Sequence, residues 1–324
     1  MLTYIIRRIL YSIPVLVATS FLIFTFVSIT GAPLGRLRAS PNITKQRIDA
    51  IAHAKNLDRP VIVRYGYWVK TAITDRFGTT LFGNRKIWPD LKRVMGHTLQ
   101  FILSAIIISV TLGILIGVYS ALRQYSVFDY AATTLSFIGF ATPVFWLALM
   151  LQVIVVNIFL KWHIRIFYTS GLSSTDPGTG IHWLLDRIQH LALPVTTLVV
   201  LGVATYSRYM RASMLEVLNS DYVRTARARG LLERRVIMKH AFRNALIPLI
   251  TLVALDFGGI FAGAIVTETI FTLDGMGFYF INALQSSDPY PVMAWLMVVA
   301  TMVIAFNLVA DILYGVFDPR IRYD

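Results

Sequence analysis

The chain has 324 residues, 56% of them hydrophobic and 15% charged, with a mean hydropathy of +0.65 and a net charge of +13. Soluble domains are about 45–50% apolar and about 25% charged, so this composition excludes an ordinary soluble core. The positive charge lies in short segments between uncharged runs about as long as a bilayer is thick, which excludes a nucleic-acid-binding protein and indicates an integral membrane protein.

Six apolar segments of roughly 20 residues each predict transmembrane helices. The first follows Arg7 and Arg8, and it is interpreted as a retained anchor because it is longer than the apolar region of a signal peptide and no Ala-x-Ala follows it. The predicted spans are Ile9 to Ile29, Thr98 to Leu122, a run inside Tyr130 to Leu160, Ile188 to Ser207, Ala245 to Thr267, and Val292 to about Phe317. The predicted fold is therefore an all-α integral membrane protein with six transmembrane helices.

The segment between the first two spans is long enough to fold by itself. Ile48, Ile51 and Ala52 recur at helical spacing, and the run from Asn56 to Pro60 is typical of a helix stop and turn. We therefore expect a small folded extracytoplasmic segment here. The predicted organisation is 1–30 as amino end and first span, 31–97 as extracytoplasmic segment, 98–317 as a five-helix core with a cytoplasmic loop at 208–244, and 318–324 as cytoplasmic tail.

The orientation follows from the Lys and Arg residues of the short loops, which accumulate on the cytoplasmic side. The termini, Arg123 and the segment 208–243 together carry fourteen such residues, nine of them in 208–243. The opposite short loops carry three. The segment 31–97 carries thirteen, but it is longer than about 60 residues, where this rule loses its force. Both termini are therefore predicted to be cytoplasmic.

Several residues within the spans are candidates for packing or movement. Pairs of glycines four residues apart, Gly113 with Gly117 and Gly259 with Gly263, would let helix backbones approach closely. Pro143 and Pro194 are candidate hinges. Asp256 falls near the middle of the predicted fifth span. An acid at membrane depth is a candidate for the transport pathway or its gate, with a packing role as the alternative.

The sequence carries no catalytic or nucleotide-binding motif. It has no Gly-Lys pair and therefore no phosphate-binding loop of the G-x-x-x-x-G-K-[ST] type, and it has no cysteine for a disulfide or a thiolate metal site. An ion-coupled secondary transporter, a channel and a membrane enzyme are the alternatives from other classes. A carrier would be expected to show more buried charges and inverted repeats. Uphill transport by this chain would need energy from a partner.

The stretch DYVRTARARGLLERRVIMKHAFRNALIP, which begins at Asp221, is the candidate contact for that partner. Ser220 can cap a short helix with small side chains, and Gly230 fits the left-handed residue that ends it. A second helix follows, with Ile237, Ala241 and Ala245 on one face and basic residues on another. The second helix could rest on anionic headgroups. The first favours docking into another protein.

The same stretch resembles the cytoplasmic signature of binding-protein-dependent ABC importer permeases. DYVRTARARG followed by HAFRNALIP is similar to the dipeptide/oligopeptide (DppB/OppB) subfamily, as are MLTYIIRRIL, NLDRPVIVRYGYW, VTETIFTLDGMG and DPYPV. The signature's Glu and first Ala are Arg224 and Thr225 here. Two outer motifs also differ, at Gly31-Ala32-Pro33 and at Asp75-Arg76-Phe77-Gly78, which leaves contacts with a binding protein open.

The resemblance implies the ABC importer type I permease fold in the plasma (inner) membrane of a bacterium. It implies four partners: a homologous second permease, two ATPase subunits that bind ATP and Mg, and an extracytoplasmic solute-binding protein that delivers peptides. Nickel chelates, glutathione or another small solute are alternative substrates. The chain itself would hold no cofactor. The implied coupling helix lies near Leu218 to Gly230, with these residues in the ATPase contact: Tyr222, Ala226, Arg227, Arg229 and Gly230.

Overall fold

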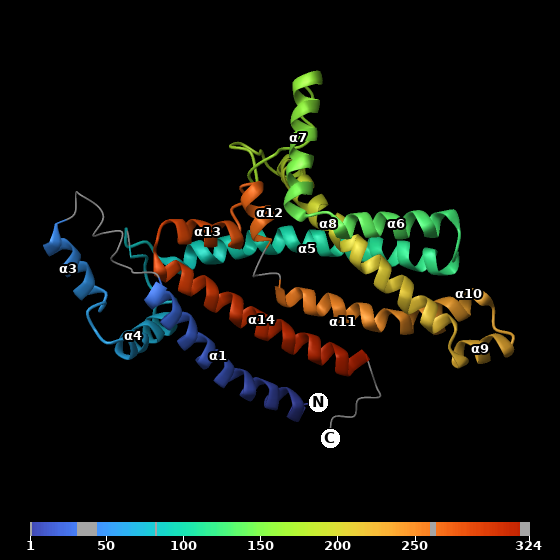
Figure 1. Cartoon of the computed structure of the whole chain (residues 1–324), viewed down its shortest axis with the longest axis horizontal. Coiled ribbons are helices and arrows are strands. Elements are labelled where there is room, and N and C mark those ends of the chain that lie inside the picture. Colours follow the sequence, from blue (N-terminus) through green and yellow to red (C-terminus); the bar gives the residue numbers. More distant parts are fainter. Residues whose placement is uncertain (1, 31–43, 82, 260–263, 318–324) are drawn as a thin grey trace. The chain divides into compact units, whose positions relative to one another are not determined.

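The computed structural model describes residues 2–30, 44–81, 83–259 and 264–317, and these are almost entirely helical (Figure 1). Among them the only extended pairing is a single bridge between Thr79 and Lys86. The helices are α1 (Leu2–Thr30), α3 (Lys45–Ala54), α4 (Val61–Thr74), α5 (Ile87–Leu122), α6 (Val127–Ala141), α7 (Val144–Trp162), α8 (Ile181–Leu218), α9 (Asp221–Ala228), α10 (Glu233–Arg235), the π-helix η1 (Val236–Phe242), α11 (Arg243–Gly259), α12 (Ile265–Ile270), α13 (Met276–Gln285) and α14 (Pro289–Phe317).

Six stretches of helix within the described residues are long and apolar enough to cross a membrane, as the sequence predicts. They are Ile6–Ile29, Ile87–Leu122, Val144–Trp162, Ile181–Leu218, Glu233–Phe257 and Pro289–Val309. Several of these helices begin earlier or end later than predicted, because their polar ends continue the helix past the apolar run.

The range predicted to contain the third span, Tyr130 to Leu160, holds parts of two helices, and the span itself is α7. α6 ends at Ala141 and α7 begins at Val144, with Thr142 in extended conformation between them. A residue that precedes proline is driven away from the helical region, and Pro143 follows here. Pro143 therefore ends one helix and opens the next. Pro194, the other candidate hinge, lies inside the continuous α8.

The fifth span also differs from the prediction. Its helix begins at Glu233 and runs through η1 into α11, so the basic second helix is continuous with the span. Asp256 consequently lies near the end of this span, where the sequence places it near the middle. Gly263 lies outside the described residues, so the Gly259 and Gly263 pair stays a prediction.

The chain divides into two compact units. The first comprises Met1–Thr98, Phe261–Ile265 and Asp274–Leu308, and the second comprises Leu99–Ile260, Val266–Leu273 and Val309–Asp324. α13 and most of α14 therefore group with the amino-terminal part, which the predicted division into 1–30, 31–97 and 98–317 does not anticipate. In the first unit, Phe24, Trp68 and Met293 belong to one buried cluster that joins α1, α4 and α14.

α8, the long yellow helix of Figure 1, is the centre of the second unit, with α6, α7 and α11 packed on it. Gly113 and Gly117 allow α5 to pack closely against α8. A Cβ atom at Gly113 would lie 2.6 Å from the Cβ of Tyr206, and one at Gly117 would lie 2.6 Å from the carbonyl oxygen of Ser207. The packing predicted for this small-residue pair is confirmed.

Candidate coupling site

α9 is a short helix, and the left-handed backbone conformation of Gly230 ends it. It ends at Ala228, and Gly230 has a φ of +74°, with its N–H donating to the carbonyl of Arg227 at 2.9 Å. A residue with a side chain is strained in this left-handed region, which is why Gly ends helices here. The predicted stop at Gly230 is confirmed. Ser220 occupies the N-cap position, but its hydroxyl donates to the Val217 carbonyl at 2.5 Å and does not cap the helix.

The two faces of α9 have different partners. Val223 and Ala226 are buried in a core of this chain that also contains Met210, Val236 and Ala241. Ala226 is 6% exposed, so its small side chain allows close approach to η1 of the same chain. Tyr222, one helical turn before Ala226 and so at the edge of this buried face, is 43% exposed. Tyr222 is therefore accessible to a partner, whereas Ala226 faces the core of this chain.

The arginines of α9 also differ from each other. The Nη2 atom of Arg227 lies 2.9 Å from Oε1 of Glu233, and its Nε lies 3.3 Å from both carboxylate oxygens. This pair spans the Gly230 turn and ties α9 to the start of α10. Arg229 is exposed and forms no ion pair within the described part of the chain. Arg229 is therefore the more available of the two for an acidic partner.

A buried ion pair, which the sequence does not reveal, anchors the helix that leads into α9. The carboxylate of Asp129 accepts hydrogen bonds from Nε and Nη2 of Arg211 at 2.6 and 2.7 Å, from the hydroxyl of Ser120 at 2.9 Å and from the N–H of Tyr125 at 3.0 Å. The hydrogen bonds from Arg211 hold the pKa of Asp129 well below its usual range, against the opposing effect of burial. The pair fixes α8 to the start of α6 and the end of α5.

Asp256, the candidate gating acid, has one hydrogen-bond partner among the described residues. The hydroxyl of Tyr206 in α8 donates to its Oδ2 at 2.7 Å. Tyr206 is buried, whereas the Asp256 side chain is exposed on the isolated chain. This contact joins α8 to α11. The described residues thus supply one hydrogen-bond donor to the Asp256 carboxylate, compared with four to the Asp129 carboxylate.

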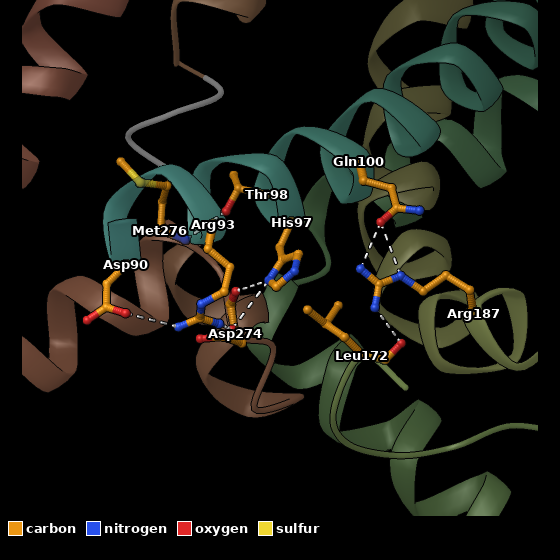
Figure 2. A network of polar contacts seen from close by, with 9 residues as sticks. All are labelled: Asp90, Arg93, His97, Thr98, Gln100, Leu172, Arg187, Asp274 and Met276. Carbon is orange, nitrogen blue, oxygen red and sulfur yellow. Dashed lines mark hydrogen bonds and ion pairs between the residues drawn. The ribbon is translucent and has the colours of Figure 1, made fainter. Parts of the chain in front are cut away.

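Figure 2 shows a polar network in the first unit that holds the loop before α13. Arg93 of α5 forms an ion pair with Asp274, and Nδ1 of His97 lies 2.7 Å from the Asp274 carbonyl oxygen. The Met276 N–H donates to Oγ1 of Thr98 at 2.7 Å. The network fixes the LDGMG run, one of the stretches on which the family resemblance depends.

The second unit has its own arginine-centred network, also drawn in Figure 2. Arg187 of α8 donates through Nε and Nη2 to the Gln100 side-chain oxygen at 3.1 and 2.8 Å, and through Nη1 to the Leu172 carbonyl at 2.8 Å. It thereby attaches the loop that precedes α8 to α5. Within the residues described, no group of three or more His, Cys, Asp or Glu side chains is arranged to hold a metal ion.

Comparison with known proteins identifies the chain. Residues 113–323 match the family model "Binding-protein-dependent transport system inner membrane component", and residues 1–86 match the model for the N-terminal part of such membrane components. The chain belongs to this family. It is a multi-pass permease component of the inner membrane.

The relatives of this permease match it from end to end. It is 37% identical to the oligopeptide transport system permease protein OppB of Mycobacterium tuberculosis (strain ATCC 25618 / H37Rv) over 99% of both chains. It is 38% identical to the oligopeptide transport system permease protein AppB of Bacillus subtilis (strain 168) over 100% of both. The dipeptide transport system permease protein DppB of Escherichia coli (strain K12) is 34% identical over 100% of this permease and 99% of its own chain. A solved amino acid ABC transporter matches at 16% identity and a TM-score of 0.47, over 72% of this chain and 94% of that one.

The sequence predicts α9, but it does not reveal the Asp129–Arg211 ion pair that anchors the helix before it. Asp129 lies three residues after Ser126, whose side chain accepts a hydrogen bond from the Asp129 N–H at 3.2 Å. A Ser followed three residues later by an acid is a helix-start signal, so this pattern could have located α6. Nothing local connects Asp129 to Arg211, 82 residues away.

Proposed function

We propose that this permease is the membrane subunit of an ATP-driven importer of di- or oligopeptides. The observation that carries the proposal is the end-to-end match to three permeases, named for oligopeptide or dipeptide transport, at 34–38% identity. Peptides would be delivered by an extracytoplasmic solute-binding protein. Permeases for nickel chelates, glutathione or another small solute are the second candidates, since substrate choice would be made largely by that binding protein.

α9 is proposed as the helix that docks on an ATPase subunit. Its buried face, Val223 and Ala226, shares one core with α8, η1 and α11, so a displacement of α9 would be passed to two spans as one body. The docking contacts are proposed to be Tyr222 as an aromatic anchor, Arg229 and Arg227 as partners for acids, and Gly230 as the turn. Ala226 is proposed to act from beneath, by keeping α9 close to its own core.

The complete importer would contain this permease, a homologous second permease and two ATPase subunits. The two permeases would form the pore together. ATP and Mg would bind the ATPase subunits, so this chain is proposed to be non-catalytic and to hold no cofactor. The dense charge of residues 208–243 supports placing this loop and both termini in the cytoplasm. Cysteine labelling from either side at Arg235→Cys, in this naturally cysteine-free chain, tests the orientation.

Asp256 is proposed as a gating residue through its bond to Tyr206. Breaking a hydrogen bond to a charged group costs about 1.5–3 kcal/mol, enough to change the balance between two states of a gate. Asp256→Asn should therefore alter the transport rate, and Tyr206→Phe should alter it in the same direction. Undiminished transport by both variants removes Asp256 from the pathway.

Reconstitution with the partner subunits tests the proposal as a whole. The assembled complex in liposomes should accumulate a labelled tripeptide only with ATP, and accumulation should survive a collapsed ion gradient. Uptake that follows the ion gradient and ignores ATP would indicate a secondary transporter instead. If the complex uses ATP but transports only a nickel chelate or glutathione, the assignment as an ATP-driven importer stands and the proposed peptide substrate is wrong.

A further inference from the structure

A cavity of about 250 Å³ lies within the first unit, among α1, the 44–86 segment and the start of α14. Its wall combines two cationic side chains, Lys55 and Arg64, with aromatic rings that include Phe24, Trp68 and Tyr290. One water takes up about 30 Å³ of the liquid, so the cavity has room for a group of several heavy atoms. None of the residues implicated above in coupling or gating lines it.

The ends of two candidate spans line the cavity, so we expect it at the depth of the membrane surface. Phe24 and Ser28 are in the last two turns of the span Ile6–Ile29, and Tyr290 and Met293 are in the first two turns of the span Pro289–Val309. At 1.5 Å per residue these side chains are within roughly 8 Å of the span ends, which is the thickness of the headgroup region. Aromatic residues are typical of this depth.

Neither cation forms a direct ion pair within the described residues, although the carboxylate of Asp288 is near enough to act on the charge of Lys55. The Nε atom of Arg64 is buried and has no hydrogen-bond partner in the structure. The Nζ atom of Lys55 donates to Oγ1 of Thr79 at 2.8 Å and lies 5.6 Å from the centroid of the Tyr290 ring, which leaves further ammonium protons to donate. Asp75 also lines the cavity, but Lys86 neutralises it at 2.6 Å.

Burial lowers the pKa of Lys55, although the charge of Asp288 opposes this effect. An anion that entered the cavity would favour the charged form of Lys55 and supply the acceptor that Arg64 lacks. Phosphate oxygens are suited to this role, because Arg and Lys are the usual protein partners of phosphate.

We propose that this cavity binds the phosphate of an anionic phospholipid headgroup, with Lys55 and Arg64 as its cationic contacts and the aromatic wall around the glycerol. The position at the ends of two spans favours a lipid over a free phosphate ion, because a phospholipid presents its phosphate at this depth. A net negative headgroup such as phosphatidylglycerol fits the two cations better than phosphatidylcholine, whose own ammonium they repel.

The test is a lipid titration of the purified, delipidated full-length chain, followed by native mass spectrometry. Phosphatidylglycerol should bind saturably at one site and more tightly than phosphatidylcholine. Lys55→Gln and Arg64→Gln should each weaken this binding about tenfold or more, since a charge-assisted hydrogen bond contributes about 1.5–3 kcal/mol. Lys55→Arg should restore it. Lys70→Gln is the matched control, because Lys70 is an exposed cation on α4 outside the cavity wall.

Four outcomes would overturn the proposal. Binding that is equal in the wild type, Lys55→Gln and Arg64→Gln would mean that no such site exists, and equal weakening by Lys70→Gln would mean unspecific charge attraction. Saturable binding of inorganic phosphate that phosphatidylglycerol does not displace would assign the cavity to the free ion. Displacement of the lipid by a tripeptide, but not by its C-terminal amide, would assign it to a peptide carboxylate.

Discussion

The element formed by residues 221–242 and the segment formed by residues 44–86 are both rich in Lys and Arg, but they are stabilised differently. The first is built on an apolar core, and the helix before it is anchored by the buried Asp129–Arg211 pair. The second also has ion pairs, His53–Asp58 and Lys86–Asp75, but both are exposed. Exposed pairs contribute about 0–1 kcal/mol each, whereas loss of one partner of a buried pair costs about 3–5 kcal/mol.

The comparison shows that ion pairs within a region do not by themselves indicate what stabilises it. The 44–86 segment depends on aromatic burial, with Trp68 packed against Phe24 and Met293. The 221–242 element directs most of its charges outward, where they are available to a partner. Four substitutions test this division, from the largest expected effect to the smallest.

Trp68→Ala should be the most damaging. Trp68 is 5% exposed, and removal of a buried tryptophan costs about 3–5 kcal/mol. The measurement is the thermal unfolding of the purified chain in detergent. Tyr67→Ala is the matched control, because Tyr67 is the adjacent aromatic residue and is exposed. Equal losses from the two variants would contradict the view that aromatic burial stabilises this segment.

Asp129→Asn should cost about 1.5–3 kcal/mol, because the partly buried Arg211 guanidinium loses its charge-assisted hydrogen bonds to the buried carboxylate. Lys86→Gln removes an exposed pair and should cost less than about 1 kcal/mol. The contrast between the two, measured by unfolding at pH 7, is the direct test of buried against exposed pairs.

The same carboxylate predicts a pH dependence. Since the folded-state pKa of Asp129 is depressed, its stabilisation is fully present above the unfolded pKa, about 3.9, and is lost as the pH falls below it. The gap in stability between wild type and Asp129→Asn should therefore narrow below about pH 4. A gap that stays constant down to pH 2 would show that the pair is not ionic.

Tyr222→Ala should leave stability unchanged and weaken association with the ATPase subunit. An exposed aromatic anchor at an interface contributes about 2 kcal/mol, which corresponds to roughly 30-fold in affinity. Co-purification and a binding titration with the ATPase measure it. Tyr209→Ala, an exposed tyrosine of α8 outside α9, is the control. If both variants bind like the wild type, α9 does not use Tyr222 as its anchor.

The sequence could predict the number of spans and the stop at Gly230, because each depends on local composition or backbone chemistry. It could not predict where the spans end. Glu233, Arg234 and Arg235 look like a loop, but a helix tolerates charges at its aqueous end, so the fifth span starts there. Pro143 illustrates the opposite error. Pro14, Pro194 and Pro248 lie inside helices, whereas Pro143 separates α6 from α7.

The contacts that join distant segments also could not be predicted. The burial of Ala226 depends on Val236 and Ala241 returning beneath α9, and small residues that face a partner look the same in sequence as small residues that face the chain's own core. The bond between Tyr206 and Asp256 links residues 50 positions apart. Helical periodicity predicts which residues lie on the same face of a helix, but it does not predict which element packs against that face.

Gly230→Ala should have the smallest effect, and it separates backbone strain from packing. A Cβ atom at Gly230 would meet nothing within 4 Å, so the cost is the left-handed φ of +74° alone, about 1 kcal/mol. Gly96→Ala in α5 is the matched control, because a Cβ there also meets nothing and its φ is ordinary, so Ala should stabilise that helix by about 0.5–1 kcal/mol. Unfolding midpoints that shift in opposite directions would establish that the Gly230 turn is held by conformation. A neutral Gly230→Ala that also retains ATPase binding would show that the end of α9 is set by the core beneath it, through Val223 and Ala226, and not by the turn.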